Sequence, residues 1–259
     1  MKYKMLIFDL DGTLLRSDKT VSEYTLEILK KCRNMGYLLG ISTSRSEFNS
    51  ARFISQLCPD AVISSGGATV SFKGEYIFKA EFSDSETAEF IAHARDICGK
   101  DTEISIDTED GHYWNFKVHP AKADSSWGDS TYCDFENFNE NSLKICVECG
   151  IYGHILKLVE SFPDCDAARY SGGDWYKFTK KSATKANAIL LLCNACGICA
   201  QEIIAFGDDY ADIEMLKICG LGVAPDNAIQ EVKKIADVIV GDNDSDGIAK
   251  YIEKELLVF

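Results

Sequence analysis

The chain has 259 residues, with 41 acidic and 27 basic side chains, so its formal net charge is −14. A prior of about 150 residues per domain predicts one large domain or two modest ones. With 46% hydrophobic and 26% charged residues, the composition is globular rather than disordered. The acid excess argues against binding to nucleic acid or to an anionic membrane surface, because both partners require a basic face.

The 11 cysteines follow no secretory leader, since the short apolar run near the N-terminus ends in acidic residues. No uninterrupted apolar stretch reaches the roughly 18 residues that a membrane-spanning helix needs. Many thiols without a leader are typical of a reducing compartment. We therefore expect a cytoplasmic protein whose partners include neither a nucleic acid nor a membrane.

Both ends of the chain alternate short apolar runs with segments of helical pattern. Ser22 can cap the first of these helices and Gly36 can stop it. Such alternation predicts an α/β fold with a doubly wound, Rossmann-like parallel sheet. The expected strands are 5–10, 37–42, 61–64, 203–206 and 238–240, and the expected helices are 22–36, 47–57 and 213–219.

The middle of the chain departs from this pattern. The turn dipeptides Asp110-Gly111 and Gly173-Asp174 stand beside aromatic strands, as in β-hairpins. The tract 121–141 has few aliphatic residues, so we expect a mobile loop or a poorly ordered segment there. An inserted α+β domain explains this change best. The predicted domains are a core formed by residues 1–81 and 179–259, and an inserted cap formed by residues 82–178.

The most specific local signal is Asp9-Leu10-Asp11-Gly12-Thr13-Leu14, at the end of the first strand. Ligands of doubly wound sheets bind at the carboxyl ends of the strands, where Asp9 and Asp11 can face one site. Gly12 permits a tight turn and a close approach of backbone N–H groups to an anion. A lone Asp-Gly pair more often caps a turn, but four specified residues after a strand favour a functional site.

A second acidic group follows another apolar strand, in Gly207-Asp208-Asp209-Tyr210-Ala211-Asp212. Asp208 and Asp212 would share one face of a helix that starts near Asp209, although acids at this place can also simply complement a helix dipole. Carboxylates gathered at strand ends repel one another unless a cation neutralises them. Oxygen ligands of this kind select Mg²⁺, which can bridge to a substrate phosphate.

The order of these motifs resembles the haloacid dehalogenase superfamily of aspartate-nucleophile phosphatases, and within it the Cof-type group, whose cap lies between the second and third motifs. The resemblance covers the full length and implies a haloacid dehalogenase-like core with an inserted cap. The matching segments are Asp9-Leu10-Asp11-Gly12-Thr13, Ile41-Ser42-Thr43-Ser44-Arg45, Thr184-Lys185-Ala186-Asn187-Ala188, Gly207-Asp208 to Asp212, Gly222-Val223-Ala224-Pro225-Asp226-Asn227-Ala228 and Asp246-Gly247-Ile248.

The resemblance implies a role for each matched acid. Asp9 is expected to be the nucleophile that forms an aspartyl-phosphate. Asp11 is expected to protonate the leaving group and then to deprotonate water. Mg²⁺ is expected on Asp9, Asp208 and the backbone carbonyl of Asp11, with Asp212 orienting a metal-bound water or Lys185.

The remaining matched residues are expected to bind the substrate. Thr43 and Lys185 would hold phosphoryl oxygens as charge spreads over them. Arg45 either reaches the substrate or the cap, or lies at the surface, and Asn227 either contacts the region of the nucleophile or caps a helix. The expected substrate-binding residues are Gly12, Thr13, Ser44, Arg45 and Asn227.

Three positions depart from the family pattern. Ser44 stands where Gly is usual, Gly66 where an Asn is frequent, and Ala211 where an Asn commonly precedes the last Asp. None of them removes a nucleophile, a metal carboxylate or the lysine. We expect a Mg²⁺-dependent phosphatase for a small phosphorylated metabolite, such as a sugar phosphate, acting as a monomer or homodimer. A phosphotransferase or phosphomutase, and a catalytically weak regulatory protein that binds such a metabolite, remain the alternatives.

Substrate choice is expected to depend on the cap, but the sequence does not indicate which face of its strands looks toward the core. Two cysteine motifs, Cys193-x-x-Cys196-x-x-Cys199 and Cys146-x-x-Cys149, suggest zinc or an iron–sulfur cluster. Their positions beside apolar helix and strand residues favour small buried thiols instead. The polar and aromatic candidates of the cap are His112, Trp114, Lys117, His119, Arg169, Trp175 and Lys177.

Overall fold

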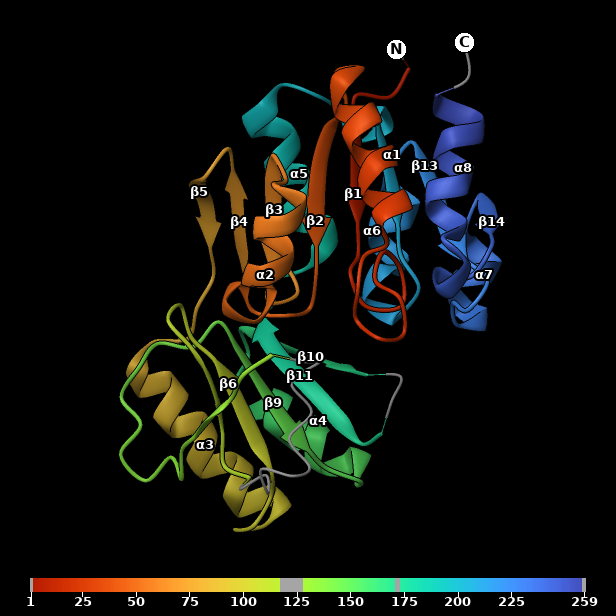
Figure 1. The fold of residues 1–259 in the computed structure, drawn as a ribbon. Helices are drawn as coiled ribbons and strands as arrows, with labels where there is room; N and C mark the ends of the chain where they lie inside the picture. Colours follow the sequence, from red (N-terminus) through yellow and green to blue (C-terminus); the bar gives the residue numbers. More distant parts are fainter. Residues whose placement is uncertain (1, 117–127, 171–172, 258–259) are drawn as a thin grey trace.

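The computed structural model describes residues 2–116, 128–170 and 173–257. Figure 1 shows two parts of the chain, one above the other, and each is built around a β-sheet with helices on its surface. Both termini lie at the end of the upper part that is farthest from the lower part. Within the described ranges, no helix combines the length and the apolar character that crossing a membrane requires.

The larger sheet is parallel except at one edge. Met5 of its central strand pairs with both Leu38 and Ile203, so segments from the two ends of the chain lie side by side. An antiparallel hairpin, which is absent from the expected elements, adds two strands to one edge of this sheet. In the turn of this hairpin, Lys73 and Gly74 both have positive φ. The strands, in spatial order, are β14 (Val238–Val240), β13 (Leu221–Pro225), β12 (Ile203–Phe206), β1 (Met5–Phe8), β2 (Leu38–Ser42), β3 (Ala61–Ser64), β4 (Thr69–Phe72) and β5 (Glu75–Lys79).

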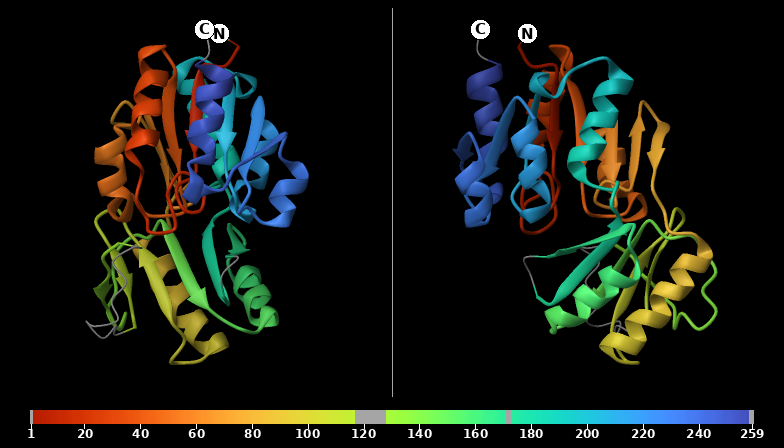
Figure 2. Two further views of the ribbon diagram at one scale, coloured as in Figure 1. Left: turned by 45° about the vertical axis from the view of Figure 1, so that its right-hand side comes forward. Right: turned by 180° about the vertical axis from the view of Figure 1, so that it is seen from behind.

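Helices cover both faces of the larger sheet, as Figure 2 shows, and the predicted doubly wound α/β fold is confirmed. Side chains alternate along a strand, so Leu6 and Phe8 face one group of helices while Met5 and Ile7 face the other. The first group is α1 (Glu23–Asn34), α2 (Glu47–Leu57) and α8 (Gly247–Leu256), and the second is α5 (Lys185–Cys196), α6 (Ile213–Ile218) and α7 (Gln230–Ile235). Short 3₁₀ helices occur at η3 (Ala200–Glu202), η4 (Tyr210–Asp212) and η5 (Asn243–Ser245).

Local signals at the helix ends act as expected. Ser22 caps α1 by accepting a hydrogen bond of 3.0 Å from the backbone N–H of Thr25. Gly36 follows the end of α1 with φ of +93°, a conformation that glycine adopts without a steric penalty. Gly197 ends α5 in the same way, with φ of +68°. The predicted cap and stop of α1 are therefore confirmed.

The smaller sheet is antiparallel except where β7 pairs with β8. The expected hairpin at Asp110-Gly111 is confirmed by the pairing of β6 with β7. Helices α3 (Asp84–Cys98) and α4 (Tyr152–Ser161) pack on one face through a shared apolar cluster. The strands, in spatial order, are β10 (Cys165–Arg169), β11 (Trp175–Lys180), β9 (Lys144–Glu148), β6 (Ile104–Asp107), β7 (His112–Trp114) and β8 (Thr131–Tyr132).

The opposite face of the smaller sheet is polar and aromatic, and we call it the open face. Phe178 and Tyr113 belong to the apolar cluster beneath the helices. Because side chains alternate along strands, their neighbours Lys177, His112 and Trp114 point to the open face. The structure thus identifies the face on which three of the polar and aromatic candidates lie. Lys117 and His119 lie outside the described residues.

The structure describes the tract 121–141 from residue 128 onward. Phe135 is only 4% exposed, and its ring meets that of Phe138 edge-on, with 5.3 Å between the centroids. Phe138 meets Tyr113 in the same manner. Aromatic rings here supply the burial that aliphatic side chains would otherwise provide, so the tract packs against the smaller sheet at Phe135 and Phe138. Residues 121–127 lie outside the described part.

The stacked pair Phe8 and Phe206 joins β1 to β12, with 4.7 Å between ring centroids and both side chains buried. Phe206→Ala should lower the free energy of unfolding by about 3–5 kcal/mol, because the lost ring leaves a cavity. Urea unfolding followed by circular dichroism measures this loss. Phe48→Ala is the control, since Phe48 in α2 is 48% exposed and should cost less than about 1 kcal/mol. Equal losses in the two variants would contradict this account of the core.

Candidate active site

The carboxyl ends of β1, β2 and β12 lie at the edge of the larger sheet that faces the smaller sheet (Figure 1). Asp9 follows β1, Thr43 follows β2 and Asp208 comes just after β12, while Lys185 opens α5. Parallel pairing of β1 with both neighbours sets these strand ends side by side. Motifs that are far apart in the sequence therefore meet at one edge of the sheet.

Lys185 is at the centre of this arrangement. Its Nζ donates hydrogen bonds of 2.6 Å to Oδ1 of Asp9 and 2.6 Å to Oδ1 of Asp212, and its side chain is 2% exposed. Burial favours the neutral amine, but the two carboxylates outweigh burial and raise the pKa of Lys185. Oδ2 of Asp212 accepts hydrogen bonds from the backbone N–H groups of Asp208 and Asp209, which shapes the loop after β12.

Asp208 points at the turn that follows β1. Its Oδ1 accepts a hydrogen bond of 2.6 Å from Oγ1 of Thr13. Gly12 has φ of +77°, and a Cβ at this position would collide with the Asp208 carboxylate. Burial and then the charge of Asp212 raise the pKa of Asp208 to about 7. The expected turn residues thus serve to bring this carboxylate close to Asp9.

Three carboxylates share this buried place. Oxygen atoms of Asp9, Asp208 and Asp212 lie within 4.8 Å of one another. Burial raises the pKa of Asp9 well above its usual range despite Lys185, and Asp212 and Asp208 raise it further. The negative charge is therefore under-compensated by the protein alone. A hard oxygen donor set with excess negative charge fits a divalent cation such as Mg²⁺.

One oxygen of the Asp9 carboxylate remains available. Among the described residues, Lys185 alone hydrogen-bonds this side chain, and it does so through Oδ1. Oδ2 can therefore approach an electrophile while Oδ1 stays fixed by the lysine. This is the arrangement that a carboxylate nucleophile requires, since the attacking atom must be oriented and must keep a free lone pair.

The side chain of Asp11 lies outside the carboxylate group. Its Oδ2 accepts from Nε of Arg45 at 2.6 Å, and its Oδ1 accepts from Nη2 of Arg45 at 2.7 Å and from Nζ of Lys19 at 2.9 Å. Burial acts to raise the pKa of Asp11, but the two cations outweigh it and hold the pKa below its usual value. Asp11 is therefore ionised in this conformation, and Arg45 reaches an acid of the site rather than the surface.

The loops after β2 and β3 are bound to each other and to the smaller sheet. Thr43 is 1% exposed, and its Oγ1 accepts a hydrogen bond of 3.1 Å from the backbone N–H of Arg45. The carbonyl of Thr43 accepts from the backbone N–H of Gly66 at 3.0 Å. The carbonyl of Ser44 accepts a hydrogen bond of 2.6 Å from Nζ of Lys144 in β9. The backbone of Ser44 therefore makes the contact, and the contact itself does not require the serine side chain.

Asn227 supports the turn that carries Asp11 and Gly12. Its Nδ2 donates a hydrogen bond of 2.7 Å to the carbonyl of Gly12, and its Oδ1 accepts from the backbone N–H of Asn243 at 3.0 Å. The N-cap of α7 is Ile229 rather than Asn227. Of the two alternatives for Asn227, the structure therefore favours contact with the nucleophile region.

The smaller sheet brings a buried amine to the same edge. Lys177 in β11 is 9% exposed, and a Cβ at Gly66 would lie 2.7 Å from its Nζ. Among the described residues, no atom accepts a hydrogen bond from this Nζ. Burial, followed by the charges of Lys185 and Lys144, lowers the pKa of Lys177 to about 8. The glycine that departs from the family pattern thus leaves room for this amine.

Asp107 and Lys144 form an ion pair on the open face of the smaller sheet, beside Lys177. Asp107 Oδ2 lies 2.7 Å from Nζ of Lys144 and accepts a hydrogen bond of 3.4 Å from Oγ of Ser65. Asp107 Oδ1 lies 2.6 Å from Nδ1 of His112. Burial opposes ionisation of Asp107, but Lys144 and His112 lower its pKa to about 2. Lys144 therefore bridges an acid of the smaller sheet and the Ser44 carbonyl of the larger one.

Sequence reasoning missed three charged residues of this site: Lys19, Lys144 and Asp107. Lys144 and Asp107 stand opposite each other in β9 and β6, and only the strand register, which the sequence does not specify, brings them together. Lys19 belongs to a loop with no motif of its own. Nothing in the structure explains Ala211.

The similarity of this chain to known proteins extends over nearly its whole length. The sequence profile of haloacid dehalogenase-like hydrolases matches residues 6–252. The HMP-PP phosphatase of Klebsiella pneumoniae is 29% identical over 89% of this chain and 86% of its own. The 5-amino-6-(5-phospho-D-ribitylamino)uracil phosphatase of Bacillus subtilis is 27% identical over 96% of both chains.

Solved structures share the fold. A sugar phosphatase of haloacid dehalogenase subclass IIB superposes with a TM-score of 0.83, at 23% identity, over 98% of this chain and 100% of its own. Fold and sequence profile agree over nearly the whole length, and they confirm the predicted superfamily and its enzymatic character. The chain belongs to the haloacid dehalogenase-like hydrolases.

Proposed function

We propose that this protein is a Mg²⁺-dependent phosphatase that hydrolyses a small phosphorylated metabolite through an aspartyl-phosphate on Asp9. One observation carries the proposal: Asp9 is held by Lys185 through one oxygen, beside the carboxylates of Asp208 and Asp212, while its other oxygen is available. Relatives named as phosphatases for two different metabolites support the reaction class. A sugar phosphate is the first substrate to test, because a solved neighbour of the same fold is a sugar phosphatase.

In the first step, Oδ2 of Asp9 attacks phosphorus and the bond from phosphorus to the leaving oxygen breaks. The leaving oxygen takes a proton from the Asp11 carboxyl group. Lys185 and Thr43 donate hydrogen bonds to the phosphoryl oxygens as charge accumulates on them. Bound at Asp9 and Asp208, Mg²⁺ would neutralise charge on the phosphoryl group and keep Asp9 ionised.

In the second step, Asp11 takes a proton from water, and the water oxygen attacks phosphorus. The bond between phosphorus and Asp9 breaks, which releases phosphate and restores the carboxylate. Asp11 is ionised beside Arg45 and Lys19 in the present conformation, so its first proton transfer requires these cations to turn toward the substrate. Substrate binding would thereby raise the pKa of Asp11 at the moment when an acid is needed.

The cap role of the smaller sheet is part of the proposal. Lys177 is buried without a partner among the described residues, and an unpaired buried charge is costly. An anionic substrate between Asp9 and the open face would supply the missing partner. The contacts of Lys144 with Ser44 and of Asp107 with Ser65 would close the cap over that substrate. All 11 cysteines are free, in keeping with the proposed cytoplasmic location.

Asp9→Asn should abolish phosphate release, with a loss of more than about 10³-fold in kcat, because the amide is not a nucleophile. Phosphate release is measured on an aryl phosphate and then on a panel of phosphorylated metabolites. Asp226→Asn is the control, since Asp226 is an exposed acid paired with Lys233, and it should keep full turnover.

The same assays separate the alternatives. Undiminished turnover in Asp9→Asn would refute the nucleophile assignment. Phosphate transferred to an added sugar rather than to water would favour a phosphotransferase, and tight binding of a metabolite without turnover would favour a regulatory protein.

Removal of divalent cations with a chelator should abolish turnover, and added Mg²⁺ should restore it. Asp208→Asn should need a higher Mg²⁺ concentration for half-maximal rate, because it removes one charged ligand of the carboxylate group. Isothermal titration with Mg²⁺ checks this weakening independently of turnover. Full activity of the chelated enzyme would overturn the metal requirement.

Lys177→Met should lower kcat/KM by about 10- to 100-fold, the cost of one charge-assisted hydrogen bond. Lys177 is protonated below its pKa of about 8, so kcat/KM of the unmodified enzyme should fall as pH rises through 8. The titratable groups around it are Lys185, Lys144, Cys146 and Asp212.

Lys177→Arg keeps the charge and should move this decline to higher pH. A purely structural role predicts a lower melting temperature for Lys177→Met. A substrate-binding role predicts an equal or higher one, because an unpaired buried charge is removed. An unchanged pH profile in both variants would contradict the assignment.

A further inference from the structure

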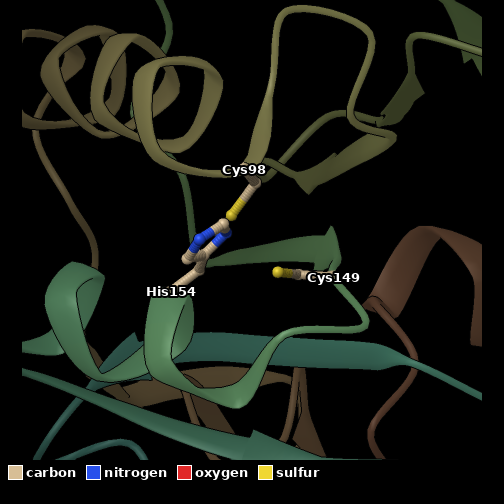
Figure 3. Close-up of side chains that lie close together, drawn as sticks. All are labelled: Cys98, Cys149 and His154. Atoms are coloured by element: carbon tan, nitrogen blue, oxygen red, sulfur yellow. The ribbon is translucent and has the colours of Figure 1, made fainter.

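Three side chains with metal-binding atoms meet in the smaller part of the molecule, away from Asp9. They are Cys98, the last residue of α3, Cys149, which follows β9, and His154 in the first turn of α4. The two sulfur atoms and a ring nitrogen of His154 all lie within 4.8 Å of one another. Figure 3 shows the sulfur of Cys149 directed toward the imidazole and the Cys98 side chain beside the ring.

These atoms have few other partners. Nδ1 of His154 is buried, and among the described residues it has no hydrogen-bond partner. Both cysteines are free. The Cys149 thiol donates a long hydrogen bond of 3.5 Å to the carbonyl of Ile151, and the Cys98 and Cys149 thiols also interact with each other. A buried ring nitrogen without a partner destabilises a fold unless a ligand satisfies it.

We propose that Cys98, Cys149 and His154 bind one zinc ion. Thiolates and imidazole are the ligands that zinc prefers, whereas Mg²⁺ prefers oxygen. In a tetrahedral zinc site the ligand atoms lie about 3.5–4 Å apart, so small side-chain adjustments would close the observed group around the ion. The two thiols release one proton each on binding, and a water molecule takes the fourth position.

The ion would join the end of α3, the end of β9 and the start of α4. Helices α3 and α4 cover one face of the smaller sheet, to which β9 belongs, and they pack on it through an apolar cluster. Lys144, which bonds the Ser44 carbonyl, stands at the other end of β9, about 16 Å from Cys149 along an extended strand. The zinc ion would therefore join these three elements at a place separate from the phosphoryl site.

Cobalt titration tests this proposal, because Co²⁺ replaces zinc and reports its ligands by absorption. The full-length protein is stripped with a chelator, kept reduced with a phosphine and held in excess Mg²⁺ to occupy the carboxylate site. One Co²⁺ per chain should produce a sulfur-to-cobalt charge-transfer band and the intense visible bands of tetrahedral cobalt. Zinc should remove both signals and raise the melting temperature.

Matched variants locate the site. Cys98→Ser and Cys149→Ser should each lose the charge-transfer band, and His154→Gln should bind Co²⁺ at least 10-fold more weakly. Cys133→Ser and His93→Gln should bind Co²⁺ as the unmodified protein does, since both residues lie in the same part of the molecule but outside the group. A band that survives in the double cysteine variant would overturn the proposal.

The unmodified protein also decides the question if a variant fails to fold. Zinc should slow the alkylation of Cys98 and Cys149 in native protein at least 10-fold, while the exposed Cys58 and Cys199 react as before. Absence of a charge-transfer band in the reduced protein would refute zinc binding. A Cys98–Cys149 disulfide found in peptides of metal-free protein prepared without the phosphine would then identify a redox pair instead.

Discussion

Asp9, Asp208 and Asp212 lie together, the first and last of them buried, and one lysine, Lys185, bonds both buried acids. Burying like charges together costs free energy, so the neighbouring elements must either donate hydrogen bonds to the carboxylates or leave room for them. Asp212 takes up two backbone N–H groups of its own loop. Gly12 provides the space that the Asp208 carboxylate occupies. The adjacency of β1 and β12 at the centre of the larger sheet brings these acids within reach of one lysine.

At the contact between the two sheets, the buried charges are positive instead of negative. Lys177 and Lys144 bring positive charge from the open face to the edge that carries the acids. Lys144 is balanced by Asp107, whereas Lys177 faces Gly66 without a partner among the described residues. A side chain at position 66 would occupy the place of this amine. The departure from the family pattern at Gly66 is therefore compensated in space by a residue of another sheet.

Most parallel strands of the larger sheet could be predicted from the sequence, because each of these is a short apolar run that ends in a polar motif. Strand β13 and the β4–β5 hairpin are absent from the expected elements. Asp9, Thr43 and Asp208 stand directly at such ends, so their meeting followed from the fold class alone. The antiparallel smaller sheet lacks such markers. The pairing of Asp107 with Lys144 depends on register, and the packing of Phe135 depends on aromatic contacts that a count of aliphatic residues ignores. Cys98, Cys149 and His154 meet only through the packing of α3 on α4, which no local spacing encodes.

The position of β1 has a consequence for biosynthesis. Its neighbour β2 follows within the first 42 residues, but its other neighbour, β12, pairs through Ile203. At about 5–20 residues per second, roughly 10–40 s separate the translation of Met5 from that of Ile203. During this interval one edge of β1 has no partner strand. Asp9 also lacks Lys185 and Asp208 until each of those residues has been translated. The nascent chain therefore carries an incomplete carboxylate group until Asp208 and Asp212 have been translated.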